Sequence, residues 1–86
     1  MITKKMKIQI KSGLEARPIA ILVQVASKFT SSIYVECGDK KVNAKSIMGM
    51  MALGLDSGEE VVVSADGEDE ENAMQDIEEF LSATNV

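Results

Sequence analysis

The chain opens with an alternation of apolar and polar positions between residues 2 and 11. The apolar side chains fall on even positions: Ile2, Met6, Ile8 and Ile10. A period of two with one apolar face predicts a half-buried β-strand. The pair Ser12-Gly13 breaks the alternation, so the strand is expected to end before it.

Residues 16–29 fit a helix better than a strand. Their apolar residues could also alternate as in a strand, but one helical stripe accounts for them too: Ile19, Leu22, Val23, Ala26 and Phe29. Pro18 suits the first turn of a helix, because a first-turn residue needs no hydrogen-bonded N–H group. The absence of an internal turn signal in this stretch favours the helix.

The middle of the chain predicts a hairpin followed by a short helix. Residues 32–37 have strong β propensity, and Gly38-Asp39 forms a two-residue turn into residues 40–43. Ser46 can cap a helix that runs to Leu53, and Gly54 suits the end of that helix.

The last third predicts a strand over residues 59–65 and a helix around residues 73–81. The strand contains three consecutive valines, and the helix has apolar residues at helical spacing: Ala73, Met74, Ile77, Phe80 and Leu81. The element order is then βαββαβα, which predicts an α+β open-faced sandwich with a four-stranded antiparallel sheet and three helices on one face.

Length and composition limit the function. With 86 residues and 45% apolar residues, we expect one domain spanning residues 1–86. The chain has no histidine, so Ser-His and Cys-His catalysis and histidine metal sites are excluded. One cysteine permits no internal disulfide, and no apolar run reaches the roughly 20 residues of a membrane span. We therefore expect a cytoplasmic protein without a membrane segment.

Charge is divided unevenly along the chain. The first 45 residues carry all nine basic residues and three acids, whereas the remainder carries eleven acids and no base. The basic residues are dispersed and aromatic residues are few, so we expect no direct binding to nucleic acid. Four acids at 68–71 lack the spacing of a calcium loop, and solvated residues at a helix start are the better interpretation.

Two short stretches could carry a function. The first is Gly13-Leu-Glu-Ala-Arg-Pro18, which lies between a predicted strand and a predicted helix. It contains the only arginine of the sequence. The second runs from Asn43 to Met51, where a capping serine precedes a helix that is apolar almost all round. An exposed methionine-rich surface for partners and simple core packing are equally good interpretations of that helix.

Together these stretches resemble HPr, the phosphocarrier family of the bacterial sugar phosphotransferase system. The resemblance covers essentially the whole chain, with Gly-Leu-x-Ala-Arg-Pro at 13–18 and Asn-Ala-Lys-Ser-Ile-Met-Gly at 43–49. It implies an open-faced β-sandwich. The phosphoacceptor histidine of the family falls at position 15, which here is Glu15. Ordinary phosphocarrier activity is therefore expected to be absent.

The regulatory serine motif around Ser46 is intact, a combination that resembles the histidine-lacking Crh group of catabolite-repression proteins. Members of that group carry glutamine at position 15, however, where this chain has glutamate. The resemblance implies a non-enzymatic regulator without a cofactor or a metal. HPr kinase/phosphorylase would phosphorylate Ser46, and the product would bind a repressor of the catabolite control protein A type. Other metabolic enzymes are further candidate partners.

The resemblance also implies the binding surface for these partners. Its expected residues are Glu15, Arg17, Lys45, Ser46, Ile47, Met48 and Met51.

Two alternatives give Glu15 a different role. It could accept phosphate as an acyl phosphate and so keep phosphotransfer, because carboxylates serve as covalent acceptors in other enzymes. It could also imitate a phosphorylated histidine in a constitutive binding module. The oligomeric state is open between a monomer and a dimer that exchanges its first strand, with Ser12-Gly13 as the hinge.

Overall fold

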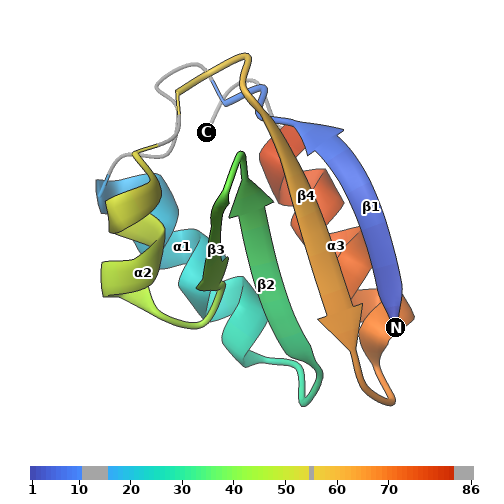
Figure 1. Cartoon of the computed structure of the whole chain (residues 1–86). Coiled ribbons are helices and arrows are strands. Elements are labelled where there is room, and N and C mark those ends of the chain that lie inside the picture. Colours follow the sequence, from blue (N-terminus) through green and yellow to red (C-terminus); the bar gives the residue numbers. More distant parts are fainter. Residues whose placement is uncertain (11–15, 55, 83–86) are drawn as a thin grey trace.

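The structure is a computed structural model that describes residues 1–10, 16–54 and 56–82, with the backbone alone for residues 16 and 17. Within these residues a four-stranded antiparallel sheet forms one layer and three helices form the other (Figure 1). The sheet has the strand order β1-β4-β2-β3. Its strands are β1 (Ile2–Lys7), β2 (Ser32–Cys37), β3 (Lys40–Asn43) and β4 (Glu60–Asp66).

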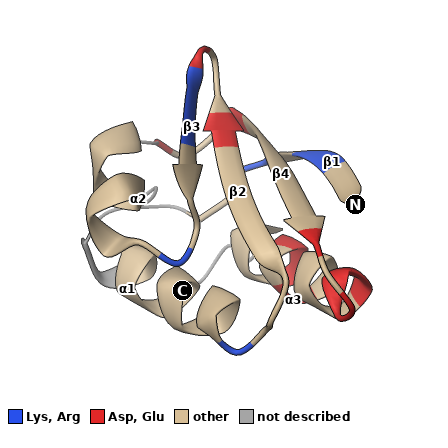
Figure 2. Cartoon of the chain, turned by 60° about the horizontal axis from the view of Figure 1, so that its bottom comes forward, with Lys and Arg blue, Asp and Glu red and all other residues tan. Residues whose placement is uncertain are grey.

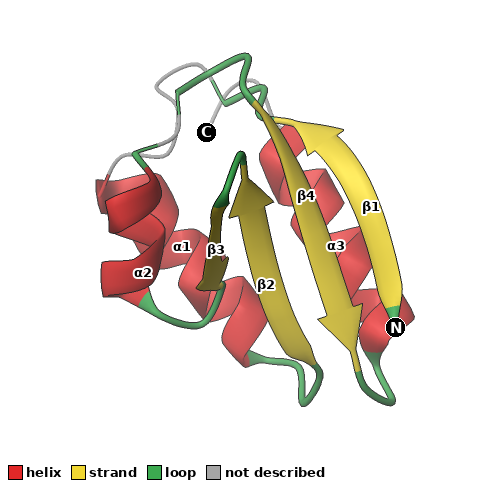
Figure 3. Cartoon of the chain, in the orientation of Figure 1, coloured by secondary structure: helices red, strands yellow, loops and turns green. Residues whose placement is uncertain are grey.

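The helices α1 (Ala16–Ser27), α2 (Ile47–Leu53) and α3 (Glu70–Ser82) all lie on the same side of the sheet (Figure 3). Helix α3 contacts β1 and β4, whereas α2 contacts β3 and α1. The predicted order βαββαβα and the predicted open-faced sandwich are confirmed. None of the described helices combines the length and the apolar character that crossing a membrane would require.

The core lies between the two layers. Alternate strand residues point toward the helices, so that Ile33 and Val35 of β2 share this space with Val61 and Val63 of β4. The helices contribute Leu22 and Ile77 among other fully buried side chains. Removing these apolar surfaces from water is the main force that holds the helices on the sheet.

The first strand is shorter than the alternation predicts. Strand β1 ends at Lys7, which pairs with Glu60, although Ile8 and Ile10 remain fully buried. The Ile8 N–H group still bonds to the segment that leads into β4, because it donates to the Glu59 carbonyl at 2.9 Å. The next N–H group, that of Gln9, instead donates to the Leu81 carbonyl in α3 at 2.8 Å. The predicted limit at residue 11 is therefore wrong, because the chain turns from the sheet toward α3.

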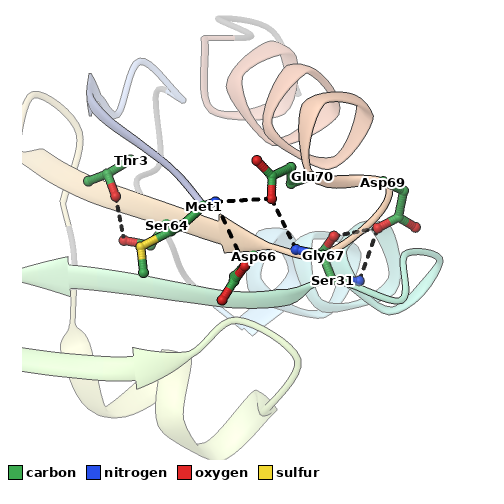
Figure 4. A network of polar contacts seen from close by, with 8 residues as sticks. All are labelled: Met1, Thr3, Ser31, Ser64, Asp66, Gly67, Asp69 and Glu70. Carbon is green, nitrogen blue, oxygen red and sulfur yellow. Dashed lines mark hydrogen bonds and ion pairs between the residues drawn. The ribbon is translucent and has the colours of Figure 1, made fainter.

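A carboxylate joins the start of α3 to the loop that precedes β2 (Figure 4). Asp69 accepts hydrogen bonds from the backbone N–H groups of Thr30 at 2.8 Å and Ser31 at 3.0 Å. It also accepts one from the Ser31 hydroxyl at 2.5 Å. Gly67 packs so closely on this loop that an added Cβ atom would lie 2.6 Å from Ser31 Cα. The end of β4 and the start of β2 are thereby fixed side by side.

This junction corrects one prediction from the sequence. Glu68 and Glu71 are exposed, as expected of solvated residues at a helix start. Asp69, in contrast, is half-buried, and both of its carboxylate oxygens accept hydrogen bonds. The Ser31 hydroxyl and the Thr30 N–H group lower the pKa of Asp69 from 3.8 to about 2. Glu70 accepts a hydrogen bond from the Gly67 N–H group, which also lowers the pKa of Glu70.

We predict that Asp69 makes stability depend on acid pH. Because its folded pKa lies below that of an unfolded aspartate, its contribution is complete above about pH 4 and is lost as the pH falls through about 2. In urea denaturation, Asp69→Asn should unfold at a lower midpoint than the parent protein at pH 7. Between pH 4 and pH 2 its midpoint should fall by less than that of the parent protein. In Glu68→Gln, which changes the exposed neighbour, the midpoint should fall over this pH range by as much as in the parent protein. If the midpoint of Asp69→Asn fell between pH 4 and pH 2 by as much as that of the parent protein, this assignment would be contradicted.

Candidate functional site

The candidate site is the segment from Asn43 to Met51, which contains the last residue of β3, a short loop and most of α2. The loop is shaped by Asn43, at the end of β3. The Asn43 side-chain oxygen accepts from the Lys45 N–H group at 2.8 Å, and its backbone carbonyl accepts from the Ser46 N–H group at 3.0 Å. Ala44 is fully buried and donates its N–H group to the Ile33 carbonyl at 2.9 Å. This loop is therefore tied directly to β2.

Ser46 stands at the N-cap of α2. Its backbone is extended, with φ −107° and ψ 115°, and its hydroxyl oxygen accepts from the Gly49 N–H group at 3.2 Å. The predicted cap is confirmed, and Gly54 ends the helix in the left-handed conformation at φ 58° and ψ 48°. Ser46 is exposed, so its hydroxyl is open to a reagent or an enzyme.

Helix α2 divides its apolar residues between the core and the surface. Met50 is fully buried, whereas Ile47, Met48 and Met51 are 47%, 84% and 51% exposed. We call these three residues the α2 patch. Met51 lies four positions after Ile47 and three after Met48, so all three share one face of the helix. Core packing is therefore the correct interpretation for Met50, and an exposed methionine-rich surface is the correct one for the α2 patch. One side of this seven-residue helix packs on the core, and the other side stays outside.

Lys45 turns inward toward the end of α1. Its ammonium group donates to the backbone carbonyl of Phe29 at 2.8 Å, and the side chain is half-buried. The family resemblance implies that Lys45 binds a partner, but no pattern in the sequence indicated this bond. The bond joins the loop before α2 to the loop before β2, which Asp69 holds from the other side.

The other predicted site residues lie at or beyond the limit of the description. Glu15, Ser12 and Gly13 fall outside the described residues, and Arg17 belongs to α1 without a described side chain. Their roles, including the hinge at Ser12-Gly13, stay predictions. Among the described residues, no group of three His, Cys, Asp or Glu side chains is arranged to hold a metal ion.

Acidic residues gather where β4 ends and α3 begins, whereas the lysines of β3 lie away from that end (Figure 2). The α2 segment itself, Ile47–Leu53, contains no charged residue. The candidate site is thus an exposed hydroxyl beside an uncharged apolar surface, an arrangement suited to recognition by another protein.

Comparison with known proteins gives consistent results. Residues 2–83 match the family described as the PTS HPr component phosphorylation site. The chain is 46% identical to the HPr-like protein Crh of Bacillus subtilis over 81 residues, which cover 94% of this chain and 95% of that protein.

Solved structures agree with this match. The HPr-C-His protein of Thermoanaerobacter tengcongensis aligns with a TM-score of 0.90 at 51% identity, over 94% of this chain and 91% of that one. Crh of Bacillus subtilis aligns with a TM-score of 0.79 at 43% identity, over 100% and 99% of the two chains. That crystal structure is described as an intertwined dimer with a swapping domain, whereas β1 here pairs with β4 of its own chain.

We predict that the Ser46 cap contributes measurably to stability. Ser46→Ala removes the acceptor for the Gly49 N–H group and should lower the free energy of unfolding by about 1 kcal/mol. Ser46→Asp keeps an acceptor at the N-cap and should retain most of that stability. Urea denaturation at pH 7 measures both variants. Equal losses in the two variants would show that capping is not the source of the effect.

Proposed function

This chain belongs to the HPr family, and on that premise we propose that it is a non-enzymatic regulator of carbon catabolite repression, switched by phosphorylation of Ser46. Its 46% identity to an HPr-like protein named Crh supports this assignment. So does the sequence, which contains no histidine and has glutamate at the position where the family carries its phosphoacceptor. The observation that carries the proposal is an exposed serine hydroxyl directly beside the α2 patch.

The proposed chemistry is a phosphoryl transfer catalysed by HPr kinase/phosphorylase. The γ-phosphoryl group of ATP forms a bond to the Ser46 hydroxyl oxygen, the hydroxyl proton leaves, and ADP is released. The cap geometry supports this step, because the oxygen accepts its hydrogen bond from Gly49 while the residue stays exposed. The transfer adds a charge of about −1.5 to −2 at the start of α2, where helix N–H groups favour an anion.

The phosphorylated surface would combine two kinds of contact. Phosphate oxygens would bind cationic donors of a partner, and Ile47, Met48 and Met51 would enter an apolar pocket. By the family resemblance, the partner is a transcriptional repressor of the catabolite control protein A type in the cytoplasm. Arg17 and Lys45 would contribute cations at the edge. Lys45 would have to leave the Phe29 carbonyl in order to do so.

The decisive test uses intact-mass measurement with two phosphoryl donors. After incubation with HPr kinase/phosphorylase and ATP, we expect one added phosphate, which Ser46→Ala abolishes. After incubation with Enzyme I and phosphoenolpyruvate, we expect no added phosphate. Glu15→His is the matched control, because it restores an imidazole at the family position and should accept phosphate from Enzyme I. Phosphorylation at Ser46 should strengthen repressor binding at least tenfold, about 1.4 kcal/mol. An unmodified Ser46 or an unchanged affinity would refute the proposal.

The same experiment separates the two alternatives for Glu15. A phosphate that Enzyme I adds and hydroxylamine removes would indicate an acyl phosphate at Glu15, and hence a phosphocarrier variant. Repressor binding that needs no kinase and is lost in Glu15→Gln would indicate a constitutive module in which Glu15 imitates a phosphohistidine. The second result is not expected, because a carboxylate carries one charge and two oxygens and so copies a phosphate poorly.

A further inference from the structure

The six methionines of the chain differ sharply in exposure. Met6, Met50 and Met74 are buried, at 7%, 0% and 5% exposure, whereas Met1, Met48 and Met51 are 73%, 84% and 51% exposed. Helix α2 therefore holds the most exposed described methionine, at position 48, and a fully buried one two residues later. The thioether groups of one short helix have opposite access to a soluble reagent.

We propose that Met48, together with Met51, is a reversible oxidation site that controls the α2 patch. The oxidant is a hydroperoxide, with hydrogen peroxide as the simplest example. The methionine sulfur attacks one peroxide oxygen and the O–O bond breaks. The sulfur gains that oxygen as a sulfoxide, and a proton moves to the departing oxygen, so that hydrogen peroxide leaves as water and an organic hydroperoxide as an alcohol. Methionine sulfoxide reductases, one for each sulfoxide epimer, restore the thioether, while two thiols are oxidised to a disulfide and the oxygen leaves as water.

The fold should tolerate this change at Met48 and Met51. A sulfoxide on an exposed side chain is hydrated at once, and α2 stays anchored by Met50, the Ser46 cap and the Gly54 terminus. Met50 shows the contrast. A sulfoxide there would place a strong hydrogen-bond acceptor in the apolar core, where it would have to be desolvated. Burial thus both protects Met50 and makes its oxidation damaging.

The consequence for binding rests on the proposed function. A partner that covers Met48 must remove water from the new S=O group, which an apolar pocket does not replace. Oxidation should therefore weaken binding of the phosphorylated protein by about tenfold. The effect requires no contact with Ser46, so phosphorylation and oxidation would act on one surface by independent chemistry.

The test treats the full chain with limiting hydrogen peroxide and maps sulfoxides by fragment-ion mass spectrometry, which resolves positions 48, 50 and 51. Met48 should gain one oxygen first, followed by the other exposed methionines, Met1 and Met51, with Met50, Met6 and Met74 at least about tenfold slower. Retention on a phenyl hydrophobic-interaction column should fall and should return after treatment with both sulfoxide reductases. The urea midpoint should not change.

The matched control is the double variant Met48→Leu with Met51→Leu, which keeps the patch apolar but removes both sulfur atoms. Its retention and its repressor affinity should resist peroxide. Because Met1 is still present in that variant, it also reports any effect of Met1 oxidation alone. A peroxide effect of equal size in the double variant would overturn the proposal.

Other results would also overturn it. Oxidation of Met50 as fast as Met48, or unchanged column retention, would refute the site without reference to any partner. Unchanged repressor affinity after complete oxidation of Met48 and Met51 would refute the control of binding. If the unoxidised, phosphorylated protein failed to bind the repressor, the proposed function would fail, while the sulfoxide map and the retention shift would still decide the oxidation site.

Discussion

The structure depends on how the backbone from Phe29 to Ser31 is held by side chains from two other segments. Asp69 binds this segment from the start of α3, through two N–H groups and one hydroxyl. Lys45 binds it from the other side, through the carbonyl of Phe29. The segment thereby joins the end of α1, the start of α3 and the loop before α2. These contacts give side-chain partners to two N–H groups and one carbonyl in a turn that belongs to no strand or helix.

The same arrangement explains why the α2 patch exists. Helices cover one face of the sheet, and α1 and α3 already fill most of the space above it (Figure 1). Helix α2 lies against β3 and α1 and inserts Met50 into the core. The helix packs closely on β3, because a Cβ atom added at Gly49 would lie 3.4 Å from the Cβ atom of Val42. A seven-residue helix at this border has one buried side, so apolar residues on its other side stay in water. Their exposure is a consequence of position, and it makes them available for binding.

Local patterns predicted most of the fold because the residues that specify each element are neighbours in the sequence. The hairpin at Gly38-Asp39, the Ser46 cap and the Gly54 terminus all depend on residues within a single turn or helix end. Contacts between distant residues were not predictable in this way. Asp69 and Ser31 are 38 positions apart, and four adjacent acids gave no indication of which one would be bound. The early end of β1 was missed for the same reason, since Leu81 captures the Gln9 N–H group.

The geometry also identifies the groups that hold the loop carrying Ser46. The hydrogen bonds described for the loop and its cap come from residues between Phe29 and Met50: Phe29, Ile33, Asn43, Ala44, Lys45, Ser46, Gly49 and Met50. Their donors and acceptors are backbone groups, one amide, one ammonium and one hydroxyl. The loop has this shape in a chain that contains no histidine. On the proposed function, phosphorylation of Ser46 would therefore need no imidazole, because local hydrogen bonds hold the exposed serine next to the α2 patch.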